Sequence, residues 1–276
     1  GRKHVRRGAD LRAAAAPLGA EPLAQRSRQP DQAGTRPGGV VGAAASAHKL
    51  RGGGTRLPYF YAKRNGERVT IEGDDARHLV RSLRKRAGDT ISVVDPAGLL
   101  LTVRLLQVST GWVTGHILEE QEHFPEPERS ITLAMAMLPA SSLDLVLSRC
   151  TEAGAARFQL VAAERSVARG GRPDRWRSIC REAAMLAGRL QVPEVRAPIG
   201  FEEAWTQAPE PYLLDRSGSP MRGLESGATL FVGPEGGWTP AELAIAGWRT
   251  LSLGPRNLRA DTAAVVGLAL ALNPLP

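Results

Sequence analysis

Two short apolar runs, each followed by a glycine-containing loop, constrain this chain more than any other feature. The runs are Leu230–Val232 and Leu251–Leu253, and the loops after them are residues 233–237 and 254–259. A helix pattern follows each loop. In open α/β sheets, ligands bind outside the carboxyl ends of strands, where loops lead into helices. If both strands belong to one sheet, both loops open on the same edge, and we expect the functional site there.

The first loop, GPEGG, is followed by a complete helix-start signature. Thr239 is placed to cap the helix, Pro240 fits the first helical position, and Glu242 completes a capping box. Because glycine has no Cβ, the loop backbone can approach a ligand closely. The loop lacks the lysine of a phosphate-binding loop, and its own acid, Glu235, would repel a phosphate. A plain tight turn remains one interpretation, and a site for a neutral or cationic ligand is the other.

The second loop leads into a helix pattern over residues 261–272 that is apolar nearly all round, as in a buried helix. This helix nevertheless begins with Asp261 and Thr262, and the loop before it carries Arg256 and Arg259. A buried helix seldom begins with such a polar cluster unless these side chains have a function. An Arg–Asp capping pair is the alternative.

Strand and helix patterns alternate from residue 131 onward, which predicts an α/β domain with a largely parallel sheet and helices on both faces. The polar, proline-containing stretch 119–130 reads as a linker before it. Besides the two runs above, we expect strands at 131–137, 158–162, 195–197 and 212–214, and helices at 142–153, 172–189 and 201–205.

Residues 57–128 are predicted to be β-rich, with one helix over about 74–86. The expected strands are 59–61, 68–71, 90–94, 99–108 and 112–118. The helix places Arg77, Arg81, Arg84 and Lys85 near one face. These side chains form either a solvated helix face or a patch that contacts RNA phosphates.

The positive charge of the chain resides in its first 56 residues. They hold 11 Lys and Arg against 3 Asp and Glu, whereas residues 57–276 hold 25 of each sign. Any nucleic-acid interface of the folded part therefore depends on local patches and not on total charge. Residues 1–56 are rich in Ala, Gly, Arg and Pro, so we expect a disordered head and assign it no function.

Several classes of protein are excluded by composition. Cys150 and Cys180 form no metal-ligand pattern with the five scattered histidines, so we expect neither a metal site nor a disulfide. No apolar run approaches the roughly 18 residues of a membrane span, and no secretory signal is visible. A cytoplasmic protein is the expectation.

The motifs of these loops resemble a known family. The segments GPEGGWTPAE and LSLGPRNLRADTAA are similar to the C-terminal signature of the ribosomal small subunit methyltransferase E family, the 16S rRNA uracil-N3 methyltransferases of the SPOUT superfamily. HLVRSLRKRAGDTISVVD resembles that family's PUA-like domain, and SLDLVLSRCTEAGAARFQLVAAERSV its segment after the linker. The resemblance extends over about residues 57–276.

The resemblance implies a fold and a cofactor. It implies a PUA-like RNA-binding domain over 57–128 and a trefoil-knotted methyltransferase domain with a parallel sheet over 129–276, assembled as a homodimer. The knot would bind S-adenosylmethionine. The residues expected to line that pocket are Leu213, Leu214, Gly233, Pro234, Glu235, Gly236, Gly237, Leu253, Gly254, Asn257 and Leu258.

The resemblance also implies a substrate, a uridine of 16S rRNA or of the small ribosomal subunit. Arg259 would orient the uridine or its phosphate, with Asp261 and Thr262 fixing that arginine as the catalytic group. The residues expected to contact RNA are Arg77, Arg81, Arg84, Lys85, Arg165 and Arg189. The proton acceptor stays open. Two further hypotheses are a SPOUT enzyme for another RNA site and a non-catalytic RNA-binding or ribosome-assembly module.

The chain departs from the family pattern at three places. Pro139 stands where a lysine is expected, Met185-Leu186-Ala187 stands where Glu-Gln-Ser is expected, and Asp261 replaces a glutamate. The first two changes remove polar or charged groups that could face RNA, so they bear on substrate choice more than on the cofactor pocket.

Overall fold

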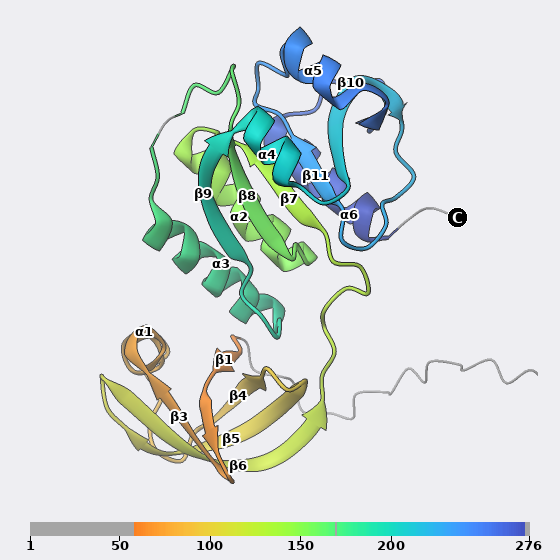
Figure 1. Ribbon diagram of the computed structural model, residues 1–276. Coiled ribbons are helices and arrows are strands. Elements are labelled where there is room, and N and C mark those ends of the chain that lie inside the picture. The colour runs from red at the N-terminus through yellow and green to blue at the C-terminus, as the bar shows by residue number, and fades with distance from the viewer. Residues whose placement is uncertain (1–57, 169, 274–276) are drawn as a thin grey trace, which may run out of the picture. The chain divides into compact units, whose positions relative to one another are not determined.

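The computed structural model describes residues 58–168 and 170–273, which belong to one compact unit (Figure 1). The predicted head, residues 1–56, lies outside the described residues. Two six-stranded sheets follow each other along the chain, the first ending at Glu122 and the second beginning at Thr132. The predicted domain boundary at 128–129 falls in the segment between them.

The first sheet is mainly antiparallel and has the order β1-β4-β5-β6-β3-β2. Only β1 and β4 pair in parallel. Its core is built from side chains that alternate along the strands, such as Val69, Ile71, Val103 and Val113. The strands are β1 (Phe60–Tyr61), β2 (Lys63–Asn65), β3 (Arg68–Glu72), β4 (Thr90–Asp95), β5 (Leu99–Val108) and β6 (Trp112–Glu122).

The prediction of a single helix over 74–86 is wrong in the length and in the type of the helix. An α-helix, α1 (Gly73–Arg77), continues as a π-helix, η1 (His78–Ser82). The helical segment stops because Arg84 adopts a φ of 52°, outside the helical region. Arg84 and Lys85 therefore lie beyond the helix and do not share a regular helix face with Arg77.

The second sheet is entirely parallel, and its order is β12-β10-β11-β7-β8-β9. The predicted α/β architecture with a parallel sheet is confirmed. The strands are β7 (Thr132–Ala136), β8 (Arg157–Ala162), β9 (Glu194–Gly200), β10 (Pro211–Pro220), β11 (Thr229–Val232) and β12 (Thr250–Ser252).

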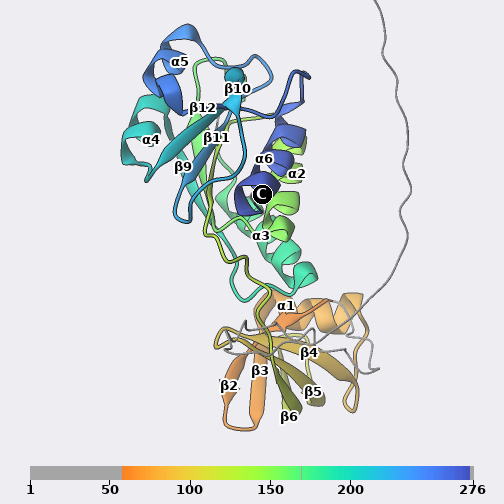
Figure 2. The same cartoon turned by 90° about the vertical axis from the view of Figure 1, so that its right-hand side faces the viewer.

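Helices cover both faces of this sheet (Figure 2). On one face α2, α3 and α6 pack into a core with Leu143, Cys180 and Leu268. On the other face α4 and α5 contribute Phe201 and Ala246 to a second core around Phe231. The helices are α2 (Ala140–Ala153), α3 (Pro173–Ala187), α4 (Phe201–Gln207), α5 (Pro240–Ala246), the short 3₁₀ helix η2 (Gly247–Arg249) and α6 (Ala260–Leu272). None of the described helices combines the length and the apolarity needed to cross a membrane.

Strand β10 runs further than predicted. The strand expected over 212–214 continues through residues 215–220 to Pro220, with an irregularity in the pairing to β12 between Leu214 and Ser219. Gly218 lies in this irregular segment. A Cβ on Gly218 would come within 2.6 Å of the carbonyl group of Thr250 and of the Leu251 nitrogen. The backbones of β10 and β12 therefore approach each other as only glycine permits.

We expect Gly218→Ala to lower the free energy of unfolding by about 3 kcal/mol, because the clash is with backbone that cannot move aside. Urea unfolding followed by circular dichroism measures this effect. Gly200→Ala is the matched control, since nothing lies within 4 Å of a Cβ there and its φ of −61° suits alanine. Equal stability of the two variants would contradict the close approach of β10 and β12.

Candidate functional site

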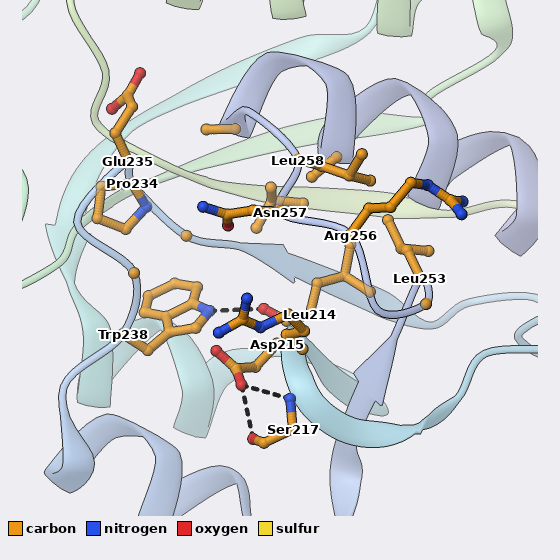
Figure 3. Close-up of a pocket in the computed structure, with 17 residues that line it drawn as sticks. Leu214, Asp215, Ser217, Pro234, Glu235, Trp238, Leu253, Arg256, Asn257 and Leu258 are labelled. Atoms are coloured by element: carbon orange, nitrogen blue, oxygen red, sulfur yellow. Dashed lines mark hydrogen bonds between the residues drawn. The ribbon is translucent and has the colours of Figure 1, made fainter.

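A hollow of about 370 Å³ opens where β11 and β12 end, beside residues 214–217 in the middle of β10 (Figure 3). Both loops singled out from the sequence contribute to it, so the shared edge expected from the sequence is the edge observed. Apolar side chains and glycine backbone share the lining with two acids, Asp215 and Glu235, and two arginines, Arg216 and Arg256. The lining residues are Leu214, Asp215, Arg216, Ser217, Val232, Gly233, Pro234, Glu235, Gly237, Trp238, Leu253, Gly254, Arg256, Asn257, Leu258, Ala260 and Ala263.

Two of the residues predicted to line a cofactor pocket do not line this hollow. Leu213 is fully buried in the core with Phe201 and Phe231, because neighbouring residues of a strand point to opposite faces. The carbonyl of Gly236 is turned toward Arg165. The predicted residues that do line the hollow are Leu214, Gly233, Pro234, Glu235, Gly237, Leu253, Gly254, Asn257 and Leu258.

The glycine-rich loop is fixed at its end by the predicted capping box, which is confirmed. The Thr239 hydroxyl accepts a hydrogen bond from the Glu242 amide, and the Glu242 carboxylate accepts one from the Thr239 amide at 2.8 Å. Glu242 is buried and also accepts from the Glu164 amide at 3.1 Å. This acid therefore joins the loop to the end of β8 and holds it in one conformation.

Arg165 gives the loop a second anchor. Its Nη1 donates to the carbonyls of Gly236 at 3.0 Å and Trp238 at 3.1 Å. Arg165 was predicted to contact RNA. In the structure its observed hydrogen bonds hold the backbone of the glycine-rich loop.

Trp238 forms one wall of the hollow and was not singled out from the sequence. Its Nε1 donates to the carbonyl of Leu214 at 3.0 Å (Figure 3). Its ring lies 5.1 Å from that of Phe201. A Cβ on Gly233 would lie 3.0 Å from this indole. Glycine at position 233 therefore allows the loop to pass directly against a ring that is held on two sides.

Asp215 is a second acid in the lining beside Glu235, and it too was missed. Its Oδ1 accepts hydrogen bonds from the amide of Ser217 at 2.8 Å and from the Ser217 hydroxyl at 2.6 Å (Figure 3). The carboxylate of Glu235 points away from Trp238 and Asp215. Because Asp215 directly follows Leu214 at the end of a predicted strand, the rule on strand ends would have identified it.

The predicted catalytic group lies at the start of α6, next to the lining residues Leu258 and Ala260. Arg259 donates to Asp261 at 3.3 and 3.0 Å, and its side chain is 72% exposed. Asp261 also accepts from the Thr262 amide at 2.7 Å. Burial acts to raise the pKa of Asp261, but hydrogen bonds from Arg259 and Thr262 outweigh it and hold the pKa below its usual value. The pair is therefore ionised at neutral pH and presents an oriented guanidinium to solvent.

The lowered pKa of Asp261 predicts a contribution to stability that depends on pH. A carboxyl whose pKa is lower when folded stabilises the protein above its unfolded pKa of about 3.9, and this contribution disappears as pH falls through the folded value. We expect Asp261→Asn to be less stable than wild type above about pH 5, with the difference shrinking below about pH 4. Urea unfolding across this range measures it. A difference that stays constant down to pH 3 would contradict the ionised pair.

The prediction that Arg189 contacts RNA is corrected by the structure. Its side chain is 6% exposed, donates to the Glu126 carboxylate at 2.6 Å, and also donates to the carbonyls of Thr151 and Ala155. A guanidinium with its donors used inside the fold is not available to RNA. Arg189 was expected at the end of the helix 172–189, but it lies outside α3 because Gly188 ends that helix with a φ of 67°.

Of the other predicted RNA contacts, Arg77, Arg81 and Arg84 are exposed, whereas Lys85 is half-buried and its Nζ lies 3.5 Å from the Thr90 carbonyl. Arg77 pairs with Asp74, whereas Arg81, Arg84 and Lys85 form no ion pair with any residue in the described part of the chain.

Residues 58–168 and 170–273 contain no cluster of three or more His, Cys, Asp or Glu that could hold a metal ion.

Two known protein families match most of the described residues. Residues 125–272 match the family described as "RNA methyltransferase domain", and residues 71–111 match the "RNA methyltransferase PUA domain". A curated protein from Synechocystis, named ribosomal RNA small subunit methyltransferase E, is 35% identical over 221 residues, covering 73% of this chain and 71% of its own. A protein of the same name from Mycobacterium tuberculosis is 30% identical over 233 residues, covering 74% and 85%.

A solved structure is similar over the same region. It is a ribosomal RNA small subunit methyltransferase E from Neisseria gonorrhoeae bound to S-adenosylmethionine. Its identity to this chain is 32%, with a TM-score of 0.70, covering 78% of this chain and 96% of that one.

Proposed function

Because this chain belongs to the ribosomal RNA small subunit methyltransferase E family, we propose that it transfers a methyl group from S-adenosylmethionine to N3 of a specific uridine in 16S rRNA. One observation carries the proposal. The hollow where β11 and β12 end beside residues 214–217 of β10 combines apolar side chains and glycine backbone with two acids, Asp215 and Glu235, and two arginines, Arg216 and Arg256. This combination supports a site for a ligand that has apolar surface and charged groups.

The residues of the hollow fit S-adenosylmethionine. The hollow offers apolar surface to the adenine ring and to the carbon chains of the cofactor through Leu214, Leu253, Leu258 and Trp238. Asp215 supplies the carboxylate that a cationic or hydroxyl-bearing ligand requires. The loop from Gly233 to Gly237 offers backbone groups without side chains. When bound there, S-adenosylmethionine supplies an electrophilic methyl group.

The reaction then requires little covalent chemistry from the protein. A carbon–nitrogen bond forms at uracil N3, a carbon–sulfur bond breaks, and the N3 proton leaves to a base or to water. The protein must place the uracil in line with the methyl group. Because N3 lies on the Watson–Crick edge, the base must be unpaired and turned out of its stack.

Arg259 is the residue we assign to this placement. It lies beside the hollow, its guanidinium is mostly exposed, and Asp261 holds it by two hydrogen bonds. Thr262 holds Asp261 in turn through its amide. An oriented guanidinium can bind a phosphate or a uracil oxygen in a fixed geometry. The remaining RNA contacts are assigned to Arg77, Arg81, Arg84, Lys85 and Arg165.

Further features of the family are proposed for this chain on the same basis. The residues 57–128 form the RNA-binding domain and 129–276 the methyltransferase domain. The order of the sheet, with β10 between β11 and β12, supports a trefoil knot at the hollow. Exposed Leu145 and Val266 on the packed helices α2 and α6 support a homodimer. The substrate in this proposal is small-subunit rRNA in the cytoplasm.

Two measurements test the proposal against its alternatives. Calorimetry with S-adenosylmethionine should give binding, and the absence of binding would favour a non-catalytic RNA-binding module. Nucleoside mass spectrometry of 16S rRNA from cells lacking the gene should show loss of 3-methyluridine. Loss of a different methylated nucleoside would favour a related enzyme for another site, and an unchanged nucleoside profile would refute the proposal.

A further inference from the structure

A second hollow, of about 490 Å³, lies on the antiparallel sheet, away from the strand ends that form the first. We propose that it binds a nucleotide of single-stranded RNA, with the base stacked on Trp112 and the adjoining phosphate held by Lys85 and Arg86. The inference rests on the proposed RNA substrate and adds a binding site for it. The lining residues are Lys85, Arg86, Ala87, Leu106, Gln107, Val108, Ser109 and Trp112.

The chemistry of this lining favours a nucleotide. Trp112 and Leu106 are each 43% exposed, which leaves a broad apolar surface beside two cationic side chains. None of the residues lining this hollow is an acid. Base stacking on aromatic side chains beside a positively charged groove is the usual means by which proteins hold single strands.

The hollow is also preformed, because both of its walls are hydrogen-bonded in place. On one side the amide of Gly88 donates to the Leu105 carbonyl, and the amide of Leu105 donates back to the Asp89 carbonyl, each at 2.8 Å. On the other side the Ser109 amide donates to the Trp112 carbonyl at 3.0 Å. A preformed site costs less ordering when a flexible strand binds.

Two irregularities of the backbone expose the residues that the site uses. The pairing of β5 with β6 shifts between Leu105 and Gln107, so Leu106 is an extra residue in the strand. Arg84 adopts a φ of 52°, which is uncommon for a residue with a side chain and turns the chain out of the helix just before Lys85. Such strain is often found at binding sites.

The test compares variants of the full chain in their affinity for a fluorescein-labelled, single-stranded oligouridine at several salt concentrations. Trp112→Leu should weaken binding at least about fivefold, while the dependence on salt stays as in wild type. Trp112→Phe, which keeps an aromatic ring, should restore most of the affinity. Lys85→Gln should instead reduce the slope of log affinity against log salt by about 0.7, the value for one phosphate contact on a single strand.

The outcomes separate this inference from the proposed function. Calorimetry with S-adenosylmethionine should give the same affinity for wild type and Trp112→Leu, which also checks the fold. If wild type methylates rRNA but Trp112→Leu binds oligouridine as wild type does, the inference is overturned and the function stands. If wild type binds no RNA, both are overturned. If fluorescein-labelled polyglutamate binds wild type and loses affinity in Trp112→Leu, while oligouridine binds both proteins equally, the hollow belongs to an acidic protein segment and the inference is overturned.

Discussion

Arg259→Ala is expected to abolish methyl transfer while leaving the affinity for S-adenosylmethionine within a few-fold of wild type. Arg259 does not line the hollow at the strand ends, and its guanidinium is exposed beside it. Removal of one oriented group that positions a reacting partner costs about 10²–10³ in rate. The two measurements are single-turnover methylation of rRNA and calorimetry with the cofactor.

The control for Arg259→Ala is Arg177→Ala. Arg177 on α3 is 73% exposed and pairs with Asp174, so the two arginines match in exposure and each pairs with a nearby aspartate, which is exposed in Asp174 and 11% exposed in Asp261. We expect Arg177→Ala to methylate rRNA at the wild-type rate. Near-wild-type turnover by Arg259→Ala would remove Arg259 from the site and leave the orientation of the uridine without an assigned residue.

Gly233→Val is expected to weaken S-adenosylmethionine binding about 100-fold, because overpacking by this amount costs about 3 kcal/mol. Even a single Cβ at position 233 would lie 3.0 Å from the indole of Trp238. The indole cannot withdraw, since its Nε1 is bonded to the Leu214 carbonyl and its ring packs against Phe201. The branched side chain must therefore enter the hollow or push the loop into it.

Gly200→Val is the matched control for Gly233→Val. Nothing lies within 4 Å of a Cβ at Gly200, and its extended backbone accepts a branched residue. This variant should bind the cofactor as wild type does. Thermal unfolding of both variants shows whether the fold is kept. A folded Gly233→Val with wild-type affinity would place the cofactor elsewhere on the protein.

Local signals in the sequence were sufficient to predict those parts of the fold that neighbouring residues determine. The start of α5 follows from Thr239, Pro240 and Glu242, whose contacts all lie within one turn of helix. The end of α2 at Gly154, which adopts a φ of 107°, is determined in the same way. Parallel pairing in the second sheet followed from the alternation of strands and helices along the chain.

The sequence was insufficient to predict local structure that depends on segments distant in the chain. Residues 215–220 have the composition of a turn, but pairing with β12 keeps them in β10. The π-helix at His78–Ser82 and the positive φ of Arg84 have no signal of their own in the residue pattern. Propensity is a weak guide when long-range pairing competes with it.

The same limit applies to the candidate site. Arg189 was assigned to RNA by resemblance to the family, and its buried bonds to Glu126, Thr151 and Ala155 could not be foreseen from spacing. Met185, one of the departures from the family pattern, is buried against the core of the antiparallel sheet. Its apolar character is therefore explained by packing.

The central claim is tested most directly by reconstituting the reaction. Purified protein is incubated with methyl-labelled S-adenosylmethionine and either free 16S rRNA or small ribosomal subunits from cells lacking the gene, and the digested RNA is analysed by nucleoside mass spectrometry. We predict that the label appears in 3-methyluridine with at least one of the two substrates. Label in a different nucleoside, or in none with either substrate, would contradict the account.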